Sequence, residues 1–194
     1  MENATNELIA RMDSDDISLP DRFEKQLRIF ENNPELDILG GAIAYFSDSP
    51  DTVFAYWYPP QSDSEIKEAI KRQSPFNHVT VMFKKSSVLA AGGYVEWFCE
   101  EDYYLWARMI KNNCKMANLH DTLVYVRTSP EQMARRGGRK YFSSELKMHT
   151  YLFKNGFIGL FRYIYNVAVR FGVEIICTPK MRLWLRKKFI WKIK

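Results

Sequence analysis

The chain has 194 residues, of which 46% are hydrophobic and 26% are charged. This balance is typical of a globular protein and excludes an intrinsically disordered chain, and the length suits one domain with a tail. Three widely spaced cysteines, Cys99, Cys114 and Cys177, form neither a metal-binding CxxC pair nor a disulfide framework, which indicates a reducing compartment such as the cytoplasm. The polar N-terminus does not resemble a secretory signal, and arginines interrupt the longest apolar stretches.

Charge is distributed unevenly along the chain. Residues 1–134 contain 13 Lys and Arg against 21 Asp and Glu, a net charge of −8, whereas residues 135–194 contain 15 against 2, a net charge of +13. We therefore divide the chain into an acidic body, residues 1–134, and a basic C-terminal region, residues 135–194. A basic region of this kind is expected to contact a polyanion, and membrane phospholipid, nucleic acid and a phosphorylated substrate all meet that description.

The body alternates predicted strands and helices, whereas the region after Pro130 is predicted to be helical. In chain order we expect a strand at 7–12, an acidic turn at 13–16, a helix after Pro20, a strand at 36–46 with a bulge at 40–41, a strand at 53–58, a helix at 62–73, a strand at 79–83, a short helix before Gly92, a helix at 102–112, and strands at 116–119 and 123–126. This order predicts a mixed α/β fold without internal repeats.

Local signals mark the start of two of these helices. Ser18 is expected to cap the first helix, whose apolar face would comprise Phe23, Leu27 and Phe30. Residues 62–65 (SDSE) form a capping box, which predicts that the second helix begins there.

The acidic turn Asp13-Ser14-Asp15-Asp16 follows the end of a predicted strand. Ligands of open α/β sheets bind at the carboxyl ends of strands, and hard divalent cations such as Mg²⁺ prefer carboxylate oxygens. An acidic turn before a helix N-terminus is also common without any ligand, because Asp is favoured at that position. From its spacing alone, the turn is explained more simply by this second interpretation.

A second acidic group, Glu100-Glu101-Asp102, begins the predicted helix at 102–112. A carboxylate there could act as a general base, and the helix N-terminus would favour its ionised form. Taken by itself, this group is again explained more simply by complementation of the helix dipole on a solvated surface.

Four segments of the chain occur in a specific order. They are residues 11–26 (RMDSDDISLPDRFEKQ), 74–83 (SPFNHVTVMF) with Gly92-Gly93-Tyr94, 101–106 (EDYYLW) and 134–141 (ARRGGRKY). They resemble, respectively, the DxD segment, the acceptor-side segment, the ED-x-x-L-W motif and the arginine-rich loop of family 2 glycosyltransferases. The nearest subgroup by resemblance is the amylovoran-type transferases of bacterial exopolysaccharide and capsule assembly. The resemblance extends from about residue 8 to residue 151, and more loosely to the end.

The resemblance implies a metal-dependent, inverting glycosyltransferase with an α/β fold of the GT-A (Rossmann-like) type. Asp15 matches the principal ligand of a divalent metal, Mn²⁺ or Mg²⁺, and Asp13 matches its companion near the nucleotide. Asp102 matches the catalytic base, and Glu101 would help to position the acceptor. The implied partners are a nucleotide-sugar donor and a polysaccharide or lipid-linked oligosaccharide acceptor.

Four further residues are assigned by resemblance to donor or acceptor binding. Arg135 and Arg136 match positions that could contact a diphosphate, although contact with membrane or solvent is equally consistent with them. His78 and Gly93 belong to the acceptor-side segment, and a histidine there is more often a hydrogen-bonded structural residue than a catalyst.

The family normally begins with strands and helices that hold the nucleotide base and ribose, and the resemblance here begins in the middle of that domain. It therefore implies a partial GT-A domain, and we expect this chain to transfer little or no sugar by itself. The alternative to an active enzyme is a non-catalytic, membrane-associated remnant of one.

The basic region contains two aromatic-rich predicted helices, at 157–173 and 181–194. Helices of this composition can lie at a membrane interface with their cations on anionic lipid, which predicts a peripheral protein at the inner, cytoplasmic face of the cell membrane. A solvated basic face packed on the core is the alternative. Nucleic-acid binding is less favoured, because the sequence contains no motif for it.

Overall fold

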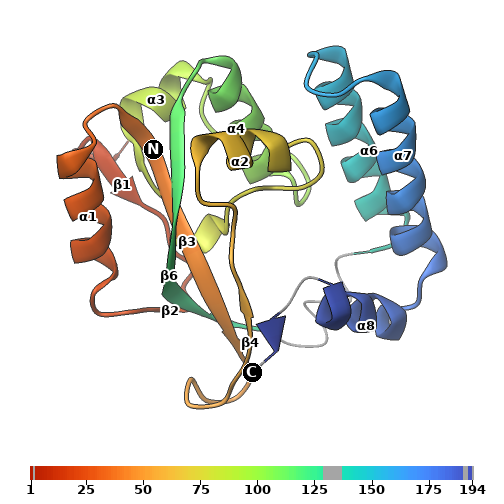
Figure 1. The fold of residues 1–194 in the computed structure, drawn as a ribbon, viewed down its shortest axis with the longest axis horizontal. Coiled ribbons are helices and arrows are strands. Elements are labelled where there is room, and N and C mark those ends of the chain that lie inside the picture. Colours follow the sequence, from red (N-terminus) through yellow and green to blue (C-terminus); the bar gives the residue numbers. More distant parts are fainter. Residues whose placement is uncertain (2, 129–136, 190–191, 194) are drawn as a thin grey trace.

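The computed structural model of the chain describes residues 1, 3–128, 137–189 and 192–193. Within this part, a central sheet is flanked by helices, and the C-terminal helices lie at the end of the sheet away from α1 (Figure 1). The mixed α/β fold predicted from the sequence is confirmed.

The sheet is seven-stranded, in the order β1-β5-β3-β4-β7, with β6 paired to β3 and β2. Its strands are β1 (Leu8–Ala10), β2 (Ile17–Ser18), β3 (Leu36–Phe46), β4 (Val53–Trp57), β5 (Met82–Lys84), β6 (Lys115–Arg127) and β7 (Lys192–Ile193). The long strands β3 and β6 run parallel, and the other pairs are antiparallel. The acidic turn therefore lies between β1 and β2, two short strands that pair with β5 and β6.

Seven α-helices are described, together with two shorter helical turns. They are α1 (Arg22–Asn32), α2 (Asp63–Ala69), α3 (Lys85–Ala90), α4 (Glu101–Lys111), α6 (Arg139–Lys154), α7 (Leu160–Phe171) and α8 (Pro179–Phe189), with a 3₁₀ turn at His78–Thr80 and a π-helical turn at Gly172–Ile176. Helices α6 and α7 form an antiparallel pair (Figure 1). In the described part of the chain, none of the helices has the length and apolarity needed to cross a membrane.

The main hydrophobic core joins β3 to α4 and extends into α6. Ile38 of β3 and Trp106 of α4 are fully buried in it, as are Met148 and Leu152 of α6. Because α6 contributes to this core, the C-terminal helices are held against the body by apolar packing as well as by hydrogen bonds.

The buried face of α1 differs from the predicted apolar face. Arg22 and Gln26 are fully buried with Phe30, whereas Phe23 and Leu27 are 48% and 41% exposed. Apolar periodicity therefore predicts the wrong face, because Arg22 and Gln26 donate from the buried side of α1 to the backbone carbonyls of Arg11 and Leu39.

Two predicted boundaries were wrong. Ser18 does not cap α1, because it lies in β2 opposite Val124. The N-cap residue is Asp21, whose side chain makes no capping hydrogen bond to the helix backbone. The two short strands predicted at 116–119 and 123–126 form one strand, β6, since it pairs along the whole of β3 and accommodates register shifts within the ladder.

Another local prediction was confirmed. The Ser62 hydroxyl accepts from the backbone of Glu65, whose side chain reaches back to the cap, so the capping box is formed. The bulge predicted at residues 40–41 of β3 is not formed there, because the register shift between Gly41 and Ala42 places the extra residues in β6, between Leu119 and Thr122.

Candidate functional site

The acidic turn brings three carboxylates together. One side-chain oxygen from each of Asp13, Asp15 and Asp16 lies within 4.8 Å of the others. Asp15 is exposed, and Asp13 and Asp16 are half-buried. Three hard oxygen ligands at this separation are a suitable donor set for one divalent cation.

The turn is held in place at both ends. Arg11 Nη2 lies 2.6 Å from Asp13 Oδ1, and the Arg127 backbone N–H donates to Asp16 Oδ1 at 3.0 Å. Burial raises the pKa of Asp16 to about 6, and the nearby charges of Asp15 and Asp13 add to the increase. A separate role for Asp16 could not be predicted from the sequence, because its hydrogen-bond partner lies in β6, more than 100 residues away.

A buried arginine supports the base of the turn. Arg22 Nη2 donates to the Arg11 carbonyl at 2.9 Å and to the Val81 carbonyl at 3.4 Å, and its Nε donates to Gln26 Oε1 at 3.1 Å. Burial lowers the pKa of Arg22 to about 10, so the guanidinium remains charged at neutral pH. Arg22 and Gln26 belong to the segment 11–26 that resembles the family, but nothing in the sequence predicts their supporting role.

The amide of Gln26 extends this support to the acceptor-side segment. Its Nε2 donates to the Leu39 carbonyl at 3.0 Å and to the Thr80 carbonyl at 2.9 Å. Helix α1 therefore connects the acidic turn, β3 and the 3₁₀ turn that carries His78.

His78 and Tyr94 form a hydrogen-bonded pair between the two acidic groups, with 2.9 Å from His78 Nε2 to the Tyr94 hydroxyl. Burial lowers the pKa of His78 to about 4, and the Arg11 cation lowers it further, against the opposing charges of Glu101 and Asp13. His78 is therefore neutral at neutral pH. Burial and the Asp102 carboxylate raise the pKa of Tyr94 well above its usual value.

Gly93 forms the turn that places Tyr94. Its φ of 64° lies in the left-handed region that favours glycine, and an added Cβ would meet nothing within 4 Å. Arg108 of α4 secures the turn, with Nη2 donating to the Gly93 carbonyl at 2.7 Å and Nη1 donating to the Ala91 carbonyl at 2.6 Å. Gly93 and Tyr94 also line a surface hollow beside Leu89.

Glu101 and Asp102 occupy the first turn of α4, close to the unpaired backbone N–H groups of the helix N-terminus. Both side chains are half-buried, and the Ser74 hydroxyl donates to Asp102 Oδ2 at 3.3 Å. Trp106, one turn further along, is fully buried and packs edge-on against His78, with 5.9 Å between ring centroids.

The structure therefore groups most of the residues predicted from the sequence. The charges of Asp13 and Glu101 both act on His78, and those of Glu101 and Asp102 act on Tyr94. Arg135 and Arg136 lie outside the described residues.

Comparison with known proteins finds related glycosyltransferases. Residues 1–92 match the sequence profile described as glycosyl transferase family 2. An uncharacterized glycosyltransferase of Haemophilus influenzae is 38% identical over 174 residues, which cover 90% of this chain and 64% of that protein. The amylovoran biosynthesis glycosyltransferase AmsE of Erwinia amylovora is 36% identical over 149 residues, covering 77% of this chain and 55% of the relative.

A third relative is the UDP-Gal:alpha-D-GlcNAc-diphosphoundecaprenol beta-1,3-galactosyltransferase of Escherichia coli. It is 35% identical over 185 residues, which cover 95% of this chain and 66% of the relative. The chain belongs to glycosyl transferase family 2, a family of sugar-transferring enzymes. It spans less than two thirds of the length of each of these three relatives.

Proposed function

We propose that the chain is a glycosyltransferase that moves a sugar from a nucleotide-sugar donor to a polysaccharide or lipid-linked oligosaccharide acceptor. The observation that carries this proposal is the cluster of three carboxylates, from Asp13, Asp15 and Asp16, in the acidic turn. The acidic turn and the first turn of α4 both act electrostatically on the His78–Tyr94 pair. The names of the relatives, which include amylovoran synthesis and transfer to a diphosphoundecaprenol-linked sugar, support the same class of acceptor.

Asp15 and Asp13 would hold a divalent cation, Mn²⁺ or Mg²⁺, and Asp16 lies close enough to join them. When bound, the metal would neutralise charge on the donor's diphosphate, which stabilises the leaving group. The ion pair from Arg11 and the amide bond from Arg127 hold two of these carboxylates in place. Positioning of this kind supplies much of the catalysis in group transfer.

Asp102 would act as the general base. It would accept the proton of the acceptor hydroxyl as that oxygen bonds to the anomeric carbon, and the bond to the nucleoside diphosphate would break with its electron pair leaving on the diphosphate. One displacement of this kind inverts the anomeric configuration. The N-terminus of α4 and the Ser74 hydroxyl both favour the ionised carboxylate that a base requires.

Glu101, His78 and Gly93 would shape the acceptor side, with His78 as a neutral hydrogen-bonding group. Arg135 and Arg136 would contact the donor's diphosphate. Since nucleotide sugars are made in the cytoplasm and lipid-linked acceptors are held in the membrane, we place the protein at the inner face of the cell membrane as a peripheral protein.

The test is sugar transfer from radiolabelled nucleotide sugars to lipid-linked acceptors with Mn²⁺ present. Asp102→Asn should lower the transfer rate by about 100-fold or more, in the range expected for loss of a general base. Binding of the donor should remain unchanged, because Asp102 lies on the acceptor side. Asp48→Asn, the same change in an exposed loop, serves as the matched control.

Equal transfer rates for Asp102→Asn and Asp48→Asn would remove Asp102 from the mechanism. Retention of the anomeric configuration in the product would contradict the single displacement. Donor and membrane binding without any transfer would favour the non-catalytic alternative.

A further inference from the structure

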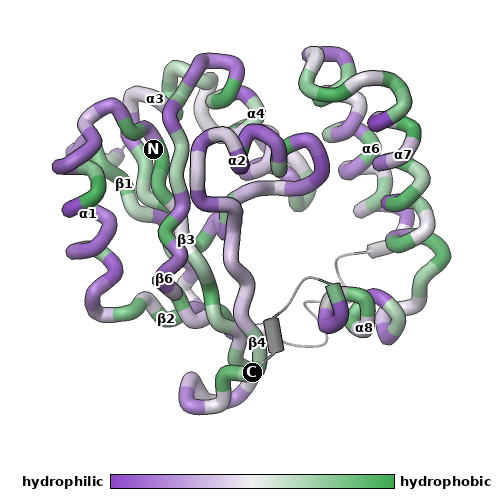
Figure 2. Tube along the Cα trace, in the orientation of Figure 1, coloured by the Kyte–Doolittle hydropathy of each residue, from purple (hydrophilic) through white to green (hydrophobic). Residues whose placement is uncertain are grey.

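The outward face of α7 is apolar along its whole length. Its exposed apolar side chains include Leu160 (54% exposed), Phe161 (89%), Ile164 (54%), Tyr165 (64%) and Val169 (44%), and we call these five the α7 face. They recur every three or four residues and so form one stripe along the helix. None of the charged side chains of α7 is exposed, since Arg162 and Arg170 are both partly buried. Figure 2 shows α7 as a mainly hydrophobic segment.

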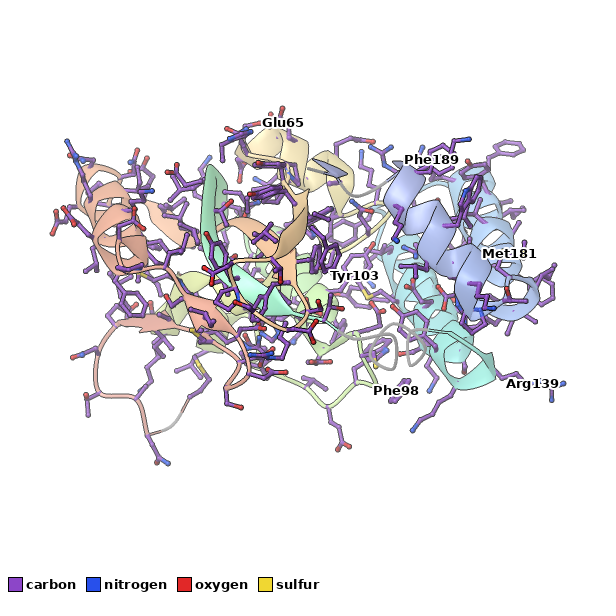
Figure 3. All side chains as sticks on the ribbon, turned by 90° about the horizontal axis from the view of Figure 1, so that it is seen from below. Glu65, Phe98, Tyr103, Arg139, Met181 and Phe189 are labelled. Carbon is purple, nitrogen blue, oxygen red and sulfur yellow. The ribbon has the colours of Figure 1, made fainter. Side chains whose placement is uncertain are left out.

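Further apolar side chains are exposed at the same end of the molecule. They are Ile176 (69%), Met181 (51%), Trp184 (56%) and Phe189 (70%). Figure 3 shows Met181 and Phe189 on α8, at the end of the molecule where α6 and α7 lie. Soluble monomers rarely leave so many large apolar side chains together in water, which indicates a binding surface.

Within the basic region, the exposed charges of the described residues all have one sign. The sequence of the basic region contains two acidic residues, Glu145 and Glu174. Both are buried, and they lie 3.3 and 3.9 Å from the guanidinium of Arg170. The exposed cations in the described part of the region are Arg139, Lys140, Lys147, Lys154, Lys180, Lys187 and Lys188. The surface thus combines apolar and cationic side chains, without an exposed acid among its described residues.

We propose that the α7 face binds the surface of an anionic phospholipid bilayer, with α7 lying in the membrane plane. A bilayer interface offers hydrocarbon directly beneath anionic headgroups, which complements both the apolar stripe and the surrounding cations. The rings of Tyr165 and Trp184 suit the headgroup level. At 12 residues, α7 is too short to span the hydrocarbon core, so it inserts one face and does not cross.

Other binding partners explain fewer of these observations. A nucleic acid would pair with the cations but would leave Phe161 and Ile164 without an apolar partner. A second copy of the chain could cover the apolar stripe, but it would not explain why the described residues of the basic region include no exposed acid. The bilayer accounts for both features together.

This inference rests on the proposed function in one respect, because membrane binding would bring the chain to an acceptor that is held in the membrane. Vesicle binding requires neither donor nor acceptor. Failure of the α7 face to bind vesicles would therefore leave sugar transfer untouched, and loss of transfer in Asp102→Asn would leave vesicle binding untouched.

The experiment is co-sedimentation of the 194-residue chain with vesicles of phosphatidylcholine alone or with 30% phosphatidylglycerol, at low and high salt. The variant Phe161→Ser/Ile164→Ser should bind the anionic vesicles about tenfold more weakly, because it removes apolar burial. Its matched control is Phe23→Ser/Leu27→Ser, which removes an exposed aromatic and aliphatic pair, 48% and 41% exposed, from α1 at the other end of the molecule. This control should bind as the wild type does. All four side chains are exposed, so circular dichroism should show both variants folded.

The charge requirement is tested separately with Lys187→Gln/Lys188→Gln, which should lower binding to anionic vesicles and flatten its salt dependence. Equal vesicle binding by the α7 and α1 variants would overturn the proposal, as would binding that ignores phosphatidylglycerol and salt. Lipid-independent self-association that disappears in the α7 variant would instead identify a second copy as the occupant. Tight binding to an oligonucleotide without vesicle binding would identify a nucleic acid.

Discussion

The Ser74 hydroxyl donates a hydrogen bond of 3.3 Å to Oδ2 of Asp102, and this bond joins the segment after α2 to the first turn of α4. The same segment is anchored from the other side by the C-terminal helices. Asn166 Nδ2 donates to the Lys71 carbonyl at 2.8 Å, and Arg170 Nη2 donates to the Arg72 carbonyl at 2.9 Å. Helix α7 therefore holds the short segment that orients the proposed base.

Ser74→Ala should slow sugar transfer while leaving the KM for the donor unchanged. Losing one hydrogen bond to a charged group should cost about tenfold in kcat. Ser74→Thr keeps the hydroxyl and should restore most of the rate. Steady-state kinetics with both variants checks this, and equal kcat values for the wild type and Ser74→Ala would show that the bond does not orient Asp102.

Arg22→Met should destabilise the fold although it keeps a long side chain. The carbonyls of Arg11 and Val81 would lose their charged donor, at a cost of about 2–4 kcal/mol. Thermal denaturation should show a melting temperature lower by about 10 °C. Arg28→Met, the same change at an exposed position of α1, should have almost no effect. Equal melting temperatures for the two variants would contradict the supporting role of Arg22.

His78 should make the fold less stable in mild acid. Its pKa is lowered to about 4 in the folded chain, below the ordinary value of 6.5, so the unfolded chain binds more protons between these two pH values. Unfolding free energy should therefore fall as the pH decreases from 6.5 to 4. His78→Gln removes this contribution, although buried His149, whose pKa is also about 4, retains its own. Urea denaturation at several pH values measures the difference, and parallel pH profiles for wild type and variant would contradict the assignment.

The sequence predicts the parts of this site that depend on short segments. The Asp13–Asp16 turn, the EDYYLW segment and the capping box at Ser62 each lie within a few consecutive residues. The resemblance of the first two to successive motifs of one family predicts that they belong to one site. The mixed α/β fold could likewise be predicted, since the alternation of strand and helix patterns is read along the chain.

Contacts between distant segments could not be predicted in this way. Apolar periodicity predicts the buried face of α1 from residues within that helix alone. Arg22 donates to the Val81 carbonyl, 59 residues away, and a pattern within one helix cannot reveal that bond. The hydrogen bond that Asp16 accepts comes from the backbone of Arg127, 111 residues away. Contacts of this kind depend on the tertiary arrangement of strands β2, β5 and β6.

The central claim is that Asp13 and Asp15 bind a divalent cation that in turn binds the donor's diphosphate. Isothermal titration calorimetry of the chain with UDP or GDP, with Mn²⁺ or with EDTA, tests it most directly, because it requires no turnover. We expect binding of at least one nucleotide that requires Mn²⁺, weakens by about tenfold or more in Asp15→Asn, and is unchanged in Asp48→Asn. Nucleotide binding of the same affinity in EDTA, or in Asp15→Asn with Mn²⁺, would contradict the account.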